Sequence, residues 1–84
     1  MTPKPKTIKV TREDISKGMP LESDACPISL AIKRTMKVKR VDVSAYEITV
    51  GSTKMSIPRS AKRFMLDFDD GRPVKPFSFQ LSLV

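Results

Sequence analysis

The chain has 84 residues, with 16 Lys and Arg against 9 Asp and Glu and no histidine, so its formal net charge is +7. Without histidine the commonest general base, proton shuttle and metal ligand is missing, and a single cysteine leaves no thiolate cage for a metal. We therefore expect no catalytic residues, no metal site and no cofactor, and a non-enzymatic protein that binds an anion.

A chain of this size forms one domain at most, and small domains often supplement a marginal core by self-association. We expect a single domain over residues 7–84, a homo-oligomer, and a flexible basic arm over residues 1–6, where Pro3 and Pro5 alternate with Lys4 and Lys6. No apolar run is long enough to span a membrane, and the N-terminus lacks the apolar core of a secretory signal. With the lone Cys26, these features predict a cytoplasmic protein.

The first elements are short. Residues 7–11 alternate apolar and polar side chains and predict a half-buried strand. Thr11 and Asp14 have the spacing of a helix N-cap and its third helical residue, and Gly18 is suited to end a helix. A helix of one or two turns is therefore expected over residues 12–17.

A second helix is expected to begin near Asp24 as its N-cap, with Pro27 tolerated in the first turn. Its apolar residues recur at helical spacing and predict the side that packs on the core. They are Ile28, Ala31, Ile32 and either Thr35 or Met36.

Residues 41–57 predict strands. Val43 and Tyr46 differ in parity, which indicates a turn or bulge between an extra short strand at 41–43 and the next strand. Gly51-Ser52 predicts a tight turn, so residues 46–57 are expected to form a hairpin.

Pro58 is expected to open a third helix, which Asp69-Asp70-Gly71 would end. Beyond it, residues 77–83 alternate apolar and polar side chains and predict a final strand. The apolar stripe of the third helix follows the i, i+3, i+4, i+7 pattern at Ala61, Phe64, Met65 and Phe68.

The element order is thus β-α-α-β-β-α-β. The simplest arrangement that buries every apolar stripe is an α+β domain with one antiparallel or mixed four-stranded sheet covered on one face by two helices.

The cations cluster on the polar faces of the second and third helices and on a connection that also contains Lys75. Arginine forks and lysine point charges are the groups that hold phosphates, although such charges also commonly form a solvated surface. In the binding interpretation Arg59, Arg63 and Arg72 clamp phosphates, and the lysines add positive field. The candidate ligand-binding residues are Lys33, Arg34, Lys37, Arg59, Lys62, Arg63 and Arg72.

Other notable residues have simpler interpretations. The four phenylalanines, at 64, 68, 77 and 79, all fall on core stripes, so only Tyr46 is a candidate exposed aromatic. Cys26 is expected to be a small buried residue, since no histidine is present to activate a thiol. The carboxylates at 67, 69 and 70 are expected to end a helix with local ion pairing rather than to bind calcium.

Three stretches, residues 8–20, 26–34 and 56–81, together resemble small accessory proteins of bacteriophages and prophages. The resemblance covers most of the chain and contains no catalytic signature. It implies an accessory role in the bacterial cytoplasm, exerted by binding a host protein or by sequestering a small host signal.

Three functions follow. The first is capture of a phosphate-rich ligand, such as a nucleotide signal of host anti-phage defence, by a small oligomer. The second is DNA or RNA binding by the same basic faces. The third is a protein-interaction module that inhibits an acidic host protein.

Overall fold

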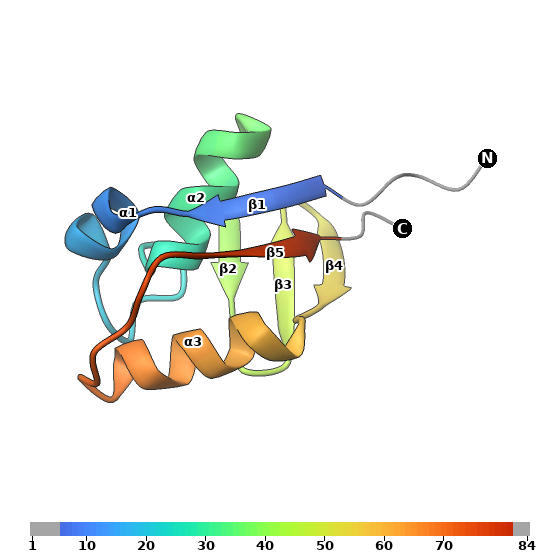
Figure 1. Cartoon of the computed structure of the whole chain (residues 1–84). Coiled ribbons are helices and arrows are strands. Elements are labelled where there is room, and N and C mark those ends of the chain that lie inside the picture. The colour runs from blue at the N-terminus through green and yellow to red at the C-terminus, as the bar shows by residue number, and fades with distance from the viewer. Residues whose placement is uncertain (1–5, 82–84) are drawn as a thin grey trace.

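The computed structural model describes residues 6–81 and contains the predicted elements in the predicted order (Figure 1). Residues 1–5 of the expected arm and residues 82–83 of the last predicted strand lie outside this range, and Lys6 already belongs to the first strand. The elements are β1 (Lys6–Val10), α1 (Arg12–Lys17), α2 (Pro27–Met36), β2 (Val41–Val43), β3 (Glu47–Val50), β4 (Thr53–Ser56), α3 (Arg59–Asp69) and β5 (Phe77–Leu81).

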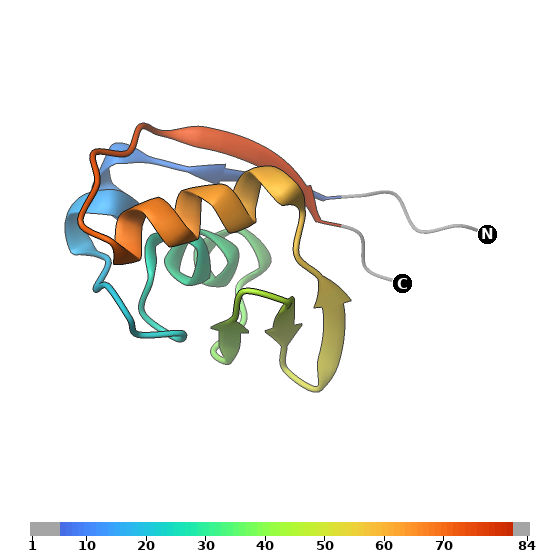
Figure 2. The same ribbon diagram turned by 90° about the horizontal axis from the view of Figure 1, so that it is seen from below.

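The class is α+β, as expected, but the single four-stranded sheet is wrong. β1 pairs with β5 in a two-stranded antiparallel sheet, and β2, β3 and β4 form a separate three-stranded antiparallel sheet. Strands of the two sheets run crosswise in Figure 1, and Figure 2 shows α2 and α3 in a layer between them.

The burial of α2 explains why two sheets form. Pro27, Ile28, Ser29, Ala31 and Ile32 are all buried, and at 3.6 residues per turn they cover more than half of the helix circumference. A helix buried so widely needs a partner on two sides. α2 contacts β1 on one side and β2 on the other, so the core lies on both faces of this helix.

Local signals set the ends of α1 and α2. Thr11 and Asp14 form the expected capping box. The N-cap of α2, however, is Cys26 and not Asp24: the Cys26 sulfur accepts the backbone N–H of Ser29 at 3.4 Å, and Pro27 occupies the first helical position. Cys26 is 3% exposed, which confirms its predicted burial.

The β3–β4 hairpin is confirmed. Val50 pairs with Thr53 across the two-residue Gly51-Ser52 turn. Gly51 has φ +62° and Ser52 a negative φ, which is the pattern of a type II′ turn with glycine first.

The aromatic stripe of α3 packs on β5. The ring centroids of Phe64 and Phe77 lie 4.7 Å apart, and those of Phe77 and Phe79 lie 5.7 Å apart. Phe64 and Phe79 are buried, while Phe68 and Phe77 are partly buried against the core, so the predicted core role of the four phenylalanines is confirmed. This packing fixes which side of α3 faces outward.

Replacing Gly18 with alanine is expected to destabilise the fold by about 1–3 kcal/mol, as in other overpacked sites. The cause is steric, because Gly18 has an ordinary φ of −68° but a Cβ there would lie 2.6 Å from both Cγ and Cδ of Pro27. Urea unfolding followed by circular dichroism measures the loss. Gly71→Asn is the control, since Gly71 has φ +76°, which asparagine tolerates, and open space around it. An equal effect of the two changes would contradict the steric explanation.

Candidate anion-binding surface

α3 is the element that displays the densest group of predicted ligand residues. Pro58, in extended conformation, precedes the helix as its N-cap and makes no side-chain capping bond. Ala61, Phe64 and Met65 face the core, so Arg59, Lys62 and Arg63 lie on the outer side. We call these three residues the α3 cationic face.

Tyr46 lies beside the α3 cationic face. The Lys62 amine nitrogen is 5.7 Å from the centroid of the Tyr46 ring, within the range of cation–π attraction, and Tyr46 is 83% exposed. Ser44 holds the loop that carries the ring, because its hydroxyl accepts the backbone N–H groups of Tyr46 at 3.2 Å and Glu47 at 3.0 Å. An exposed aromatic ring therefore lies next to the cations of α3.

Charge is distributed along α3 against the helix dipole. Cations occupy its N-terminal half, while Asp67, Asp69 and the C-cap Asp70 occupy its C-terminal end. A charge of the unfavourable sign at a helix end typically costs about 0.3–1 kcal/mol. The order of charges along α3 therefore does not favour the stability of this helix.

Two of the predicted phosphate clamps already have carboxylate partners. The Arg63 Nε is 3.5 Å from an Asp67 oxygen, and the Arg72 Nε is 2.9 Å from an Asp70 oxygen. These pairs confirm the local ion pairing expected at the end of α3. Exposed pairs contribute only about 0–1 kcal/mol, so a phosphate can replace either carboxylate.

Arg63 and Arg72 do come together, in an open groove of about 530 Å³. Asp67, Asp69 and Asp70 line the same groove, so its charge is mixed rather than basic. The N-terminal half of α3, where Arg59 and Lys62 lie, contains cations and no carboxylates, which makes it the better candidate.

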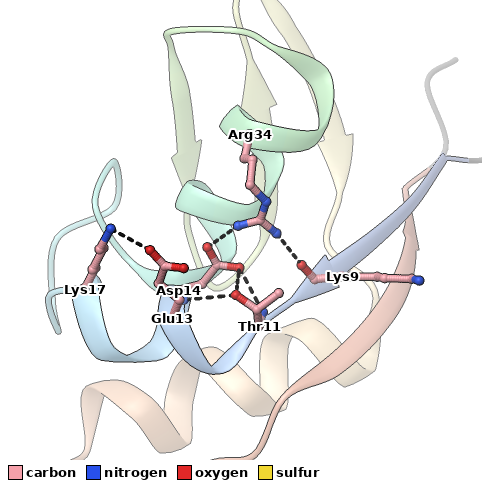
Figure 3. A network of polar contacts seen from close by, with 6 residues as sticks. All are labelled: Lys9, Thr11, Glu13, Asp14, Lys17 and Arg34. Atoms are coloured by element: carbon pink, nitrogen blue, oxygen red, sulfur yellow. Dashed lines mark hydrogen bonds and ion pairs between the residues drawn. The ribbon is translucent and has the colours of Figure 1, made fainter.

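The predicted ligand residues of α2 are placed differently. The Arg34 guanidinium bonds to Asp14 and donates to the backbone oxygen of Lys9 at 2.8 Å (Figure 3), and the Lys33 amine donates to the backbone oxygen of Asp24. Both cations thus hold parts of this chain together. Lys37 is exposed at the C-terminal end of α2, in left-handed conformation at φ 55°, and this end points away from α3 in Figure 1.

The seven candidates are therefore not one site. Arg59, Lys62 and Arg63 share a helix face, Arg72 joins Arg63 in a groove, and the α2 residues lie elsewhere. The residue that the sequence list lacked is Tyr46. The sequence predicts that Tyr46 is exposed. Its contact with Lys62 cannot be predicted in the same way, because it depends on how the β2–β3 loop packs against α3.

Residues 6–81 contain neither a cluster of metal ligands nor a membrane-spanning helix. No group of three or more His, Cys, Asp or Glu in this range could hold a metal ion. No helix in the same part of the chain is long and apolar enough to cross a membrane.

Comparisons of the chain with protein-family models, with curated proteins and with solved structures found no match. The resemblance to bacteriophage accessory proteins therefore remains a prediction from the sequence.

Proposed function

We propose that this protein is a non-enzymatic binding protein that holds a phosphate-rich anionic ligand on the α3 cationic face together with Tyr46. The observation that supports this function best is the position of the exposed Tyr46 ring next to Lys62. Lys62 lies on α3, which also presents Arg59 and Arg63. Exposed aromatic rings on a basic surface are the feature with which proteins hold nucleobases and phosphates together.

Each part of this surface has a distinct task. Arg59 and Lys62 supply charge to a phosphate, and the start of α3 adds the partial positive charge of the helix dipole, which no side-chain cap offsets. The Tyr46 ring offers one face for stacking of a base.

The shape of the surface favours a nucleic-acid strand over a single nucleotide. Along the part of the chain that the structure describes, the grooves that flank α3 are open, and those that contain Arg63 also contain Asp67. A strand can cross such an open face, whereas a nucleotide pocket would need walls from a second copy of the chain.

The biological setting is proposed from the sequence resemblance. A bacteriophage accessory protein with this surface would act in the cytoplasm of the host and capture a nucleotide signal of anti-phage defence, a host nucleic acid, or an acidic host protein. A homo-oligomer, the expected state of so small a chain, would place two α3 cationic faces in one assembly.

Replacing both Arg59 and Lys62 with alanine is expected to weaken the binding of labelled single-stranded DNA at low salt by about tenfold or more. The slope of log affinity against log salt concentration is expected to decrease in magnitude by about 1–2. Fluorescence anisotropy measures both effects. Tyr46→Ala is expected to cost about fivefold or more, the loss of one stacked base. Little change in melting temperature is expected, because Arg59 and Tyr46 are exposed and Lys62 is only half-buried.

The matched control is the double change Lys9→Ala and Lys39→Ala, which removes two exposed cations that lie outside α3. The control variant and the Arg59/Lys62 variant therefore have the same net charge. Equal weakening by the two double variants would mean that only total charge matters and would contradict a site on α3. A parallel thermal-shift series with mononucleotides and cyclic dinucleotides tests the ligand class: a saturable shift with one of these, and none with DNA, assigns the face to a nucleotide.

A further inference from the structure

A second surface lies at the other end of α3, between its C-terminal half, the loop that leads into α2 and the β2–β3 loop. It is a groove of about 280 Å³, and its apolar lining comes from all three segments. We call it the Leu21 groove; its apolar lining residues are Leu21, Cys26, Val43, Ala45, Met65 and Leu66.

Two leucines stand exposed at this groove. Leu21 is 80% exposed and Leu66 is 46% exposed, and both also line the adjoining groove of about 530 Å³. Single exposed leucines are common on protein surfaces, but here two of them line the same pair of grooves. Burying one leucine side chain there would contribute about 1.5–3 kcal/mol to binding.

The backbone at Leu21 holds its side chain outward. Leu21 has φ 64°, in the left-handed region that leucine rarely adopts, and its N–H donates to the Asp69 carboxylate at 2.9 Å. Glycine or asparagine would satisfy this conformation with less strain. Because the side chain is so exposed, the core gains little from a leucine here, and the residue type calls for another explanation.

The charge around the Leu21 groove is negative, in contrast to the net charge of +7 for the chain. The charged residues that line it, within the described part of the chain, are Glu22 and Asp69, whereas the adjoining groove contains Asp67 and Asp70 together with Arg63 and Arg72, with which they pair. The carboxylates of Asp69 and Asp70 also lie at the negative end of the α3 dipole, where a cation from outside would be favoured.

We infer that the Leu21 groove docks a basic segment of a protein partner, with one apolar side chain of that segment packed between Leu21 and Leu66 and flanking lysines or arginines beside Glu22 and Asp69. The apolar lining supplies affinity, and the carboxylates select against acidic segments and against nucleic acid. This site adjoins the α3 cationic face, since Arg63 lines the groove beside it, but it does not depend on the function proposed for that face.

The test is an NMR titration of the full chain with a short synthetic peptide that has one leucine flanked on both sides by arginine and lysine. Shifts are expected at the amides of Leu21, Leu66 and Asp69. A peptide with glutamates in place of the basic residues, and one with serine in place of leucine, are expected to leave these amides unchanged. Absence of shifts at the groove with the leucine peptide, or equal shifts with the glutamate peptide, would overturn the inference.

Leu21→Gly separates binding from folding. Because glycine adopts positive φ readily, the melting temperature is expected to stay the same or rise, while peptide affinity falls by about tenfold or more. Met19→Ala is the matched control, since Met19 is 55% exposed and lines neither groove. Unchanged affinity in folded Leu21→Gly would overturn the site. Native mass spectrometry that shows a dimer lost in Leu21→Gly would assign the groove to a second copy of this chain and overturn the assignment to a basic partner.

Discussion

Replacing Asp14 with alanine is expected to lower the free energy of unfolding by about 3 kcal/mol, from the loss of a helix cap and of a charged hydrogen-bond network. Asp14 is 5% exposed, and one of its carboxylate oxygens accepts the Thr11 backbone N–H at 2.8 Å and the Thr11 hydroxyl at 3.0 Å. Its other oxygen pairs with Arg34, which in turn holds the β1 backbone at Lys9 (Figure 3). One side chain thus joins β1, α1 and α2.

Urea unfolding followed by circular dichroism measures this loss, and Glu13→Ala is its control on the same helix. Glu13 pairs with Lys17 in a fully exposed contact, so its removal is expected to change stability little at neutral pH. The Lys17 hydrogen bond and positive charge lower the pKa of Glu13. The small stabilisation from Glu13 is therefore present above the ordinary pKa of glutamate and is lost as the pH falls through the lowered value. Similar losses from Asp14→Ala and Glu13→Ala would show that the Arg34 network contributes nothing.

Replacing Ile32 with alanine is expected to cost about 3–4 kcal/mol, within the range found for buried isoleucines. Ile32 is fully buried on α2, the helix that contacts both sheets, so the cavity would open in the part of the core that joins them. A domain of this size has roughly 4–12 kcal/mol of stability in total, so the substitution would remove about a quarter of it or more.

Leu30→Ala is the control on the same helix, because Leu30 is only half-buried and should cost about 1 kcal/mol. Hydrogen exchange provides a second readout for Ile32→Ala. Amides of β1 and of β3 are expected to lose protection together, since both sheets pack around α2. Loss of protection in one sheet alone would contradict the role of α2 as the element that joins the sheets.

Caps, turns and the buried sides of individual elements can be predicted from residues that are close together in the sequence. The Thr11–Asp14 capping box, the Gly51 turn, the core stripe of α3 and the alternation in β5 each depend on residues within a turn or two of each other. Helix and strand periods act over that same short distance, so these predictions were confirmed. The N-cap of α2 shows the limit: Asp24 has the better capping chemistry, yet Cys26 next to Pro27 is where the helix begins.

The pairing of the strands could not be predicted from such short-range patterns. β1 and β5 come from opposite ends of the chain, and the apolar pattern of each is satisfied equally by one large sheet or by two small ones. The choice depends on the width of the buried surface of α2, where Ser29 is fully buried although a stripe count treats it as polar. A pattern of residue types predicts that one side of a helix or strand is apolar, but not how many neighbouring elements pack against that side.

The same holds for the candidate site. Composition and spacing established an excess of positive charge on helix faces, and with it the expectation of an anionic ligand. The surroundings of each cation depend on elements that are distant in sequence. Arg34 pairs with Asp14, Lys62 lies against the Tyr46 ring, and Lys37 is exposed to solvent. The strained Leu21 and its bond to Asp69, 48 residues away, likewise exist only once α3 has docked. Periodicity acts within an element, whereas these contacts arise from packing between elements.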